Sequence, residues 1–177
     1  SVFGIEKKQF PYMLCVTNLL LHGIDTPLVY HDNSLTKDVL NYTDEDKFDV
    51  VLMNPPYGGN EKSDVKSHFP SDMRSSETAD LFMVLIMYRL KKSGRAAVIV
   101  PDGFLFGADN TKIAIKTKLL RDFNLHTIIR LPGSIFAPYT SIATNILFFD
   151  NNSAEGAPEG YSTKETWFYR LDMPEGY

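Results

Sequence analysis

The residues best suited to chemistry in this sequence are Asn54, Pro55, Pro56 and Tyr57, which follow one another directly. An amino group on an aromatic ring is a poor nucleophile, because its lone pair is delocalised into the ring. The side-chain oxygen of Asn54 and the carbonyl of Pro55 could accept its two hydrogens and stabilise the positive charge that develops on the nitrogen. The Tyr57 ring offers a flat surface for stacking a base. The pattern predicts methylation of an exocyclic amine; the alternative is an ordinary turn, since Asn and Pro are common in turns.

The segment that must position these groups is 48–53, in which five of six residues are apolar and two are β-branched. Such a run predicts a buried strand in a parallel sheet that is covered on both faces. Each proline fixes its own φ and pushes the residue before it, Asn54 and then Pro55, into an extended conformation. The polar groups are therefore expected at the carboxyl end of the strand, where open α/β sheets bind their ligands.

The rest of the chain alternates between predicted strands and helices. Helices are expected over 11–21, 77–91 and 110–123, and strands over 1–6, 28–31, 96–100, 126–131, 143–149 and 166–170. This alternation predicts an α/β fold with a mostly parallel sheet. The strands at 126–131 and 143–149 have no long helix between them, which predicts an antiparallel pair near the C-terminus. The helix over 11–21, with Cys15, is apolar nearly all round and is expected to be well buried.

The segment 58–75 is long for a loop in a compact domain and leaves directly from the candidate corner. One interpretation is a lid or a DNA-contacting loop, with Lys62, Lys66, His68 and Arg74 reaching phosphate groups. A solvated loop is an equal alternative.

Composition limits the class of protein. The 177 residues, 44% hydrophobic and 23% charged, are ordinary for a globular domain. A net charge of −4 argues against an autonomous nucleic-acid binder, because such proteins need a basic surface. The single cysteine excludes an internal disulfide, and no metal-ligand spacing is present. No apolar run is long enough to span a membrane and no signal-peptide pattern occurs, so a cytoplasmic protein is expected.

Two further sites have the residue types of nucleoside binding. Glu6 is expected at the carboxyl end of the first predicted strand, where an acidic residue commonly accepts hydrogen bonds from ribose hydroxyls. The alternative is an ordinary exposed glutamate beside Lys7 and Lys8. Asp32 or Asn33, directly after the strand at 28–31, could reach an adenine ring, and a turn is equally credible there.

Residues 54–57 after an apolar strand resemble the catalytic motif of amino-group methyltransferases that use S-adenosylmethionine. Further stretches are similar to the methyltransferase subunits of type I restriction-modification systems. These are residues 18–23, 77–82, 94–103 and 130–132, then Phe136 and residues 144–149. The resemblance covers about residues 1–150.

The resemblance implies methyl transfer from S-adenosylmethionine to the exocyclic amine of adenine in DNA. It implies a Rossmann-like methyltransferase fold, with a largely parallel sheet and one antiparallel strand. By position, Asn54, Pro55 and Tyr57 would bind and activate an adenine flipped out of the duplex. Phe136 would pack on the base from the other side, although from sequence alone it is as easily a core residue.

The resemblance also assigns a cofactor site and partners. Glu6 would match the ribose-binding acid, and Asn33 would match the contact to the adenine of the cofactor. A separate specificity subunit would read the DNA sequence and a restriction subunit would complete the system, which agrees with the acidic charge balance.

The sequence departs from the family's pattern in one respect. The family carries a glycine-rich cofactor loop after its first strand, and none is present here. The expectation is a fragment that lacks the first strand, with a partial catalytic domain over 1–150, a linker and an edge strand over 151–177, and weak cofactor binding on its own. Two alternatives stay open: a non-catalytic truncated module, and a methyltransferase acting on glutamine amides in proteins, whose chemistry uses a similar corner.

Overall fold

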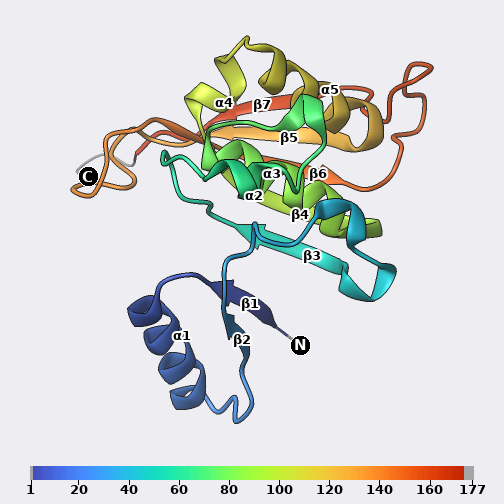
Figure 1. Ribbon diagram of the computed structural model, residues 1–177. Coiled ribbons are helices and arrows are strands. Elements are labelled where there is room, and N and C mark those ends of the chain that lie inside the picture. Colours follow the sequence, from blue (N-terminus) through green and yellow to red (C-terminus); the bar gives the residue numbers. More distant parts are fainter. Residues whose placement is uncertain (1, 174–177) are drawn as a thin grey trace. The chain divides into compact units, whose positions relative to one another are not determined.

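The computed structural model describes residues 2–173, and the chain divides into two compact units, Ser1–Lys37 and Asp38–Tyr177. The first unit contains strand β1 (Phe3–Glu6), helix α1 (Gln9–Leu21) and strand β2 (Leu28–His31). β1 and β2 pair in parallel, with Phe3 opposite Leu28 and Glu6 opposite His31. The unit is thus a single strand-helix-strand element (Figure 1), as the sequence predicts for these segments.

The expectation that this helix is well buried is wrong. No residue of α1 is buried, Leu14 and Leu21 are 55% and 81% exposed, and Cys15 is exposed as well. The reason is geometric: the helix is apolar on more sides than two strands of four residues can cover.

The second unit is built on a five-stranded sheet in the order β3-β4-β6-β5-β7 (Figure 1). Its strands are β3 (Phe48–Met53), β4 (Leu90–Pro101), β5 (Asn124–Arg130), β6 (Thr144–Asp150) and β7 (Trp167–Arg170). β3 pairs in parallel with β4, and β5 with β7, whereas β6 runs antiparallel to both of its neighbours. The predicted antiparallel pair and the predicted edge strand are confirmed.

Helices cover one face of this sheet. The two longest, α3 (Thr78–Arg89) and α5 (Asn110–Asp122), contact each other, and they pack on β4 and β5 respectively. α3 is buried from Thr78 to Met87 except for Phe82, so it forms the centre of the unit. The unit also contains shorter helices: η1 (Val39–Asn41), η2 (Asp44–Asp46), α2 (Ser63–Lys66), η3 (Ser71–Met73) and α4 (Asp102–Phe106).

The segment 58–75 belongs to this unit and is not a loose loop. It contains α2 and η3 and buries Val65, Phe69 and Met73. The Arg74 guanidinium donates to the carbonyls of Phe69 and Ser67, at 2.9 and 3.2 Å. These contacts contradict the solvated loop, because apolar side chains fasten the segment to the core.

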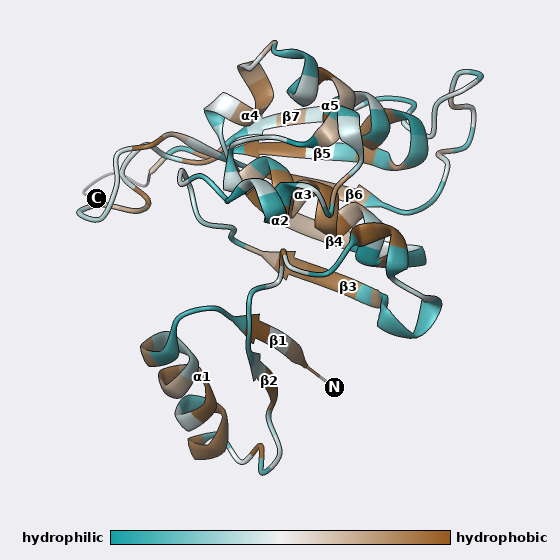
Figure 2. Cartoon of the chain, in the orientation of Figure 1, coloured by the Kyte–Doolittle hydropathy of each residue, from teal (hydrophilic) through white to brown (hydrophobic). Residues whose placement is uncertain are grey.

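The expectation that β3 is buried on both faces is also wrong. Val51 is buried, but Val50 and Leu52 are 49% and 77% exposed. β3 lies at one end of the five-stranded sheet, and the helices cover only the face toward which Val51 points. In Figure 2 the strand is largely brown although one of its sides has no cover.

This face continues across the sheet, exposed at its two ends and half-buried in the middle strands. Pairing of the strands puts Leu52, Ala97, Phe148, Thr127 and Trp167 in one row on that side. Trp167, at the far end of this row, is 69% exposed. One side of the sheet therefore carries the core, and the opposite side presents apolar residues that no helix of this unit covers.

β4 begins at Leu90, several residues before its predicted start, and Gly94 is the point at which its backbone comes closest to β3. A Cβ at this position would lie 2.9 Å from the Lys91 carbonyl oxygen and 3.1 Å from that of Asp49. A side chain would force the two strands apart at the point where β3 enters the sheet. Gly94 thus helps to position the strand that carries the candidate corner.

Candidate active site

The corner Asn54–Tyr57 follows β3 directly and lies at the carboxyl end of the strand, as the sequence predicts. Pro55 is buried, Tyr57 is half-buried, and Asn54 is exposed. The buried proline fixes the corner to the unit, while the Asn54 side chain stays accessible to a ligand. Gly58 and Gly59 come next, with φ of 78° and 91°, and let the chain turn away from the corner.

Within the corner, the Tyr57 hydroxyl donates a hydrogen bond to the side-chain oxygen of Asn54. Burial raises the pKa of Tyr57, and this effect exceeds the lowering by the hydrogen bond to Asn54. The phenol therefore stays protonated near neutral pH and remains a donor. The bond also orients the amide, because it places the Asn54 oxygen, not the nitrogen, toward Tyr57.

A second aromatic side chain reaches the corner from a distant segment. The rings of Tyr57 and Phe136 lie edge to face, with centroids 6.0 Å apart and an interplanar angle of 62°. Phe136 is half-buried in the turns between β5 and β6, where its carbonyl accepts from the amide of Tyr139 at 2.9 Å. The structure thus brings together the two aromatic residues to which the resemblance assigns the target base.

The segment that leaves the corner is anchored to the start of α3. The Gly59 carbonyl accepts from the Thr78 hydroxyl at 3.0 Å and from the Thr78 amide at 3.3 Å. Asn60 and Glu77 form an isolated antiparallel bridge. The corner is therefore fixed on both sides, by β3 before it and by the first turn of α3 after it.

The start of α3 is in turn held by a charged cluster that sequence reasoning did not assign. Lys112, which is 4% exposed, donates to Glu77 at 2.6 Å and to the fully buried Asp80 at 2.9 Å. The Ser75 hydroxyl donates to the same oxygen of Asp80 at 2.6 Å. Burial raises the pKa of Asp80, and this outweighs the lowering by Ser75 and Lys112. For Lys112 burial alone would lower the pKa, but the hydrogen bonds to Glu77 and Asp80 outweigh it and raise the pKa.

A second cluster joins three strands at the same edge of the sheet. Asp102, just after β4, accepts from Arg130 at the end of β5 and from the Asn145 side chain at 2.8 Å. The sequence carries a signal for both clusters: Asp80 interrupts an apolar helix, and Asp102 follows an apolar strand. Neither signal indicates which basic residue pairs with the aspartate, because Lys112 and Arg130 lie far from Asp80 and Asp102 along the chain.

The cofactor candidates lie in the first unit. Glu6 ends β1, and its carbonyl accepts from the Asp32 amide at 3.2 Å, so the ends of β1 and β2 are adjacent. One carboxylate oxygen of Glu6 accepts from the Lys8 amide at 2.7 Å. The side-chain oxygen of Asn33 accepts from the Leu35 amide at 3.1 Å, which is an Asx turn of the kind considered as the alternative. A turn and a ligand role are compatible here, because the Asn33 amide nitrogen is not used by that bond.

Between residues 2 and 173, no cluster of His, Cys, Asp and Glu side chains has the arrangement of a metal site. Over the same residues no helix has the length and apolar character needed to cross a membrane.

Comparison with known proteins agrees with these features. The family described as N-6 DNA Methylase matches residues 1–175. The chain belongs to this family.

Relatives of known identity point in the same direction. The methylase subunit of the type I restriction enzyme EcoEI from Escherichia coli is 48% identical over 177 residues, which is 99% of this chain and 34% of that protein. A crystal structure of a modification subunit of a putative type I restriction enzyme from Vibrio vulnificus is 46% identical, with a TM-score of 0.90. The match covers the whole of this chain and 36% of that subunit. The chain thus spans about a third of the length of these relatives.

A more distant structure confirms the fold class. A putative class I S-adenosylmethionine-dependent methyltransferase from Listeria monocytogenes matches 95% of this chain and 48% of its own length, with a TM-score of 0.74 at 20% identity. At this identity the match shows the fold alone. The predicted α/β methyltransferase fold is confirmed.

Proposed function

We propose that this chain forms part of the catalytic domain of a type I restriction-modification methylase subunit. The reaction is transfer of a methyl group from S-adenosylmethionine to the exocyclic amine of adenine in DNA. The observation that carries the proposal is the arrangement of Asn54, Tyr57 and Phe136 at the end of β3, in a chain of the N-6 DNA methylase family.

In this proposal the Asn54 side-chain oxygen and the Pro55 carbonyl accept the two hydrogens of the adenine amine. Accepting both hydrogens localises the lone pair on the nitrogen and stabilises the positive charge that builds up during methyl transfer. Pro55 and Pro56 fix the backbone of this corner, so the acceptors need little rearrangement when the base arrives. Asn54 is exposed, which leaves its side chain accessible to the amine.

Capture of the base is assigned to Tyr57 and Phe136. Adenine must leave the duplex before its amine reaches the corner, at a cost of a few kcal/mol. Stacking on an aromatic ring returns about 1–3 kcal/mol per base. The centroids of the two rings lie 6.0 Å apart in an edge-to-face contact. An incoming base would displace this contact and pack against the rings.

The cofactor proposal is S-adenosylmethionine, which supplies the electrophilic methyl group when bound. Glu6 would accept hydrogen bonds from its ribose hydroxyls, and Asp32 or Asn33 would contact its adenine. Within residues 2–173, one oxygen of the Glu6 carboxylate has an assigned partner, the Lys8 amide, and the other has none. A carboxylate with one oxygen available at the end of a parallel strand fits a ribose hydroxyl.

Partners follow from the same family. A specificity subunit would select the DNA sequence and a restriction subunit would cleave unmodified DNA. The net charge of −4 supports this division of labour, because a chain with an acidic balance depends on a partner for much of its hold on the DNA backbone.

The decisive experiment measures transfer of labelled methyl by the full-length protein together with its specificity subunit. Label should appear at the adenine exocyclic amine of duplex DNA that contains the target sequence. Label on a protein glutamine would instead support an amide methyltransferase, and no label on either substrate would support a non-catalytic module. The Asn54→Ala variant is the control for contaminating methyltransferases.

A further inference from the structure

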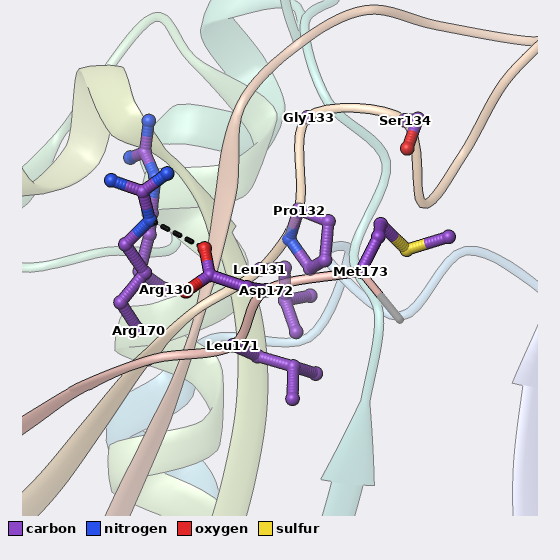
Figure 3. A pocket seen from close by; sticks show the side chains of 9 residues that line it. All are labelled: Arg130, Leu131, Pro132, Gly133, Ser134, Arg170, Leu171, Asp172 and Met173. Carbon is purple, nitrogen blue, oxygen red and sulfur yellow. Dashed lines mark hydrogen bonds and ion pairs between the residues drawn. The ribbon is translucent and has the colours of Figure 1, made fainter. Parts of the chain in front are cut away.

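A second feature of the same sheet edge is a polar pocket of about 430 Å³ between the ends of β5 and β7 (Figure 3). It lies apart from residues 54–57, and its lining combines two arginines with a turn of backbone. The lining residues are Arg130, Leu131, Pro132, Gly133, Ser134, Arg170, Leu171, Asp172 and Met173.

The two arginines face each other across a strand ladder. Arg130 and Arg170 are direct partners in the parallel pairing of β5 with β7. Like charges at directly opposed positions repel each other, unless an anion lies between them. Arg130 donates to Asp102, and the Arg170 Nε donates to Asp172 at 2.8 Å. Each guanidinium thus has one carboxylate partner and four further N–H groups.

Arg170 is the more available of the two. Its side chain is 79% exposed, and for residues 2–173 Asp172 is the only acceptor assigned to it. An exposed ion pair of this kind contributes little to stability and exchanges readily with other partners. Its forked terminal nitrogens have the geometry that matches two oxygens of a phosphate.

The turn on the other side of the pocket adds donors. In the described part of the chain, no acceptor is assigned to the backbone amides of Gly133 and Ser134 or to the Ser134 hydroxyl. The carbonyl of Pro132, which precedes them, accepts a hydrogen bond from the Ile135 amide at 3.1 Å. This bond stabilises the turn. The lining thus combines two guanidinium groups with backbone amides that have no assigned acceptor, and Asp172 is the acidic lining residue that an incoming anion must displace. Such a lining favours an anion with several oxygens.

The pocket shares an edge with the candidate active site. β3, β4, β5 and β7 all run in one direction, so their carboxyl ends lie along the same edge of the sheet. β5 is three strand positions from β3, a distance of about 14 Å at about 4.8 Å per strand. The segment that lines the pocket up to Ser134 continues within two residues to Phe136.

We propose that this pocket binds a phosphate of the DNA backbone, on the strand that carries the target adenine and within a few nucleotides of it. This inference rests on the proposed function. At about 3.4 Å per nucleotide step, 14 Å corresponds to about four steps. The phosphate contact positions the strand, so that the extruded base lies over Tyr57 and Phe136, and reads no sequence.

The test measures DNA binding by the full-length methylase complex as a function of salt. Arg170→Gln should weaken binding about fivefold to tenfold, equally for specific and non-specific DNA, and lower the salt slope by about one. The affinity for S-adenosylmethionine should not change. Arg95→Gln is the matched control: Arg95 is exposed in the middle of β4, opposite the last residue of β6, and its removal should leave DNA affinity unchanged.

A second arm locates the contact on the DNA. Single methylphosphonate substitutions remove one phosphate charge at a time within five nucleotides of the target adenine. One position should weaken binding by the parent complex and have no further effect on Arg170→Gln. Equal losses for parent and variant at every position would overturn the inference, as would an unchanged salt slope. If the parent methylates adenine in either case, the proposed function stands while the pocket assignment fails.

Discussion

The Tyr57 hydroxyl donates a hydrogen bond to the side-chain oxygen of Asn54, the same oxygen that the proposed mechanism assigns to the adenine amine. An amide oxygen has two lone pairs, so it can accept from Tyr57 and from the amine together. The bond would therefore set the orientation of Asn54 before the base arrives. Tyr57 would then serve twice, by its ring toward the base and by its hydroxyl toward Asn54.

These two contributions separate in a pair of variants. Tyr57→Phe keeps the ring and loses the hydroxyl, so turnover should fall about twofold to tenfold, the effect of one hydrogen bond of about 0.5–1.5 kcal/mol. Tyr57→Ala also loses the stacking surface and should weaken base capture by about tenfold or more. Turnover comes from methyl transfer, and capture from fluorescence of a 2-aminopurine at the target position. Equal capture by Phe and Ala variants would exclude stacking on this ring.

Asn54→Ala should reduce kcat by about 100-fold to 1,000-fold, comparable to the loss of one preorganised donor in an oxyanion hole. The affinity for S-adenosylmethionine, measured by calorimetry on the full-length protein, should stay at the parent value because Asn54 acts on the acceptor amine. Asn54→Asp is the matched control, since it keeps an oxygen acceptor in place and should lose less activity. Unchanged turnover in Asn54→Ala would remove this residue from the mechanism.

Glu6→Gln should raise the Kd for S-adenosylmethionine about tenfold or more, because a hydrogen bond to a charged group contributes about 1.5–3 kcal/mol. At saturating cofactor kcat should match the parent, since Glu6 is assigned to the ribose and not to the reacting atoms. Asp25→Asn removes an exposed carboxylate from the same unit and should leave the Kd unchanged. The same Kd in both variants and the parent would place the ribose elsewhere.

Lys112→Met should destabilise the fold by about 3–5 kcal/mol, because it leaves the fully buried Asp80 without its cationic partner. Urea denaturation followed by circular dichroism gives the free energy of unfolding. Lys92→Met, at an exposed position, should change it by less than about 0.5 kcal/mol. Adding Asp80→Leu to Lys112→Met should recover part of the loss, and a double variant less stable than the single one would contradict this account.

Asp122 should make stability depend on pH at the acidic end. Hydrogen bonding to Arg121, followed by that to Lys118, lowers the pKa of Asp122 below its ordinary value. The stabilisation is therefore present above pH 4 and is lost as the pH falls through the lowered pKa. Asp122→Asn should cost at most about 1 kcal/mol at pH 7, since the side chain is 33% exposed, and less as the pH falls through the lowered pKa to pH 2. A cost that is the same at both pH values would mean that charge is not involved.

The parts of the fold that the sequence predicts well are those specified by neighbouring residues. The corner at Asn54–Tyr57, the helix α3 and the antiparallel pair of β5 with β6 depend on short apolar runs and on prolines and glycines beside them. Their positions agree with the structure to within a few residues. The resemblance to a family assigns Tyr57 and Phe136 to opposite sides of a base, whereas their direct edge-to-face contact comes from the structure alone.

Burial and pairing could not be predicted in the same way. Val50 and Leu52 have the composition of a covered strand, yet they are exposed because the helices of their unit cover only the opposite face of the sheet. Lys112 would be expected on the outer side of its helix, yet it lies inside because Asp80, from another helix, neutralises it. Both facts depend on which elements become neighbours, and this is not encoded in any local window of sequence.

The bare side of the five-stranded sheet has a practical consequence for handling the protein. Leu52 and Trp167, at the two ends of its row, are exposed and offer apolar binding surface in the native state. Hydrophobic dyes such as anilinonaphthalene sulfonate should therefore brighten with the folded chain, before any denaturant is added. Melting curves that rely on such dyes would start from a high baseline, so intrinsic spectroscopic signals are the better choice for this molecule.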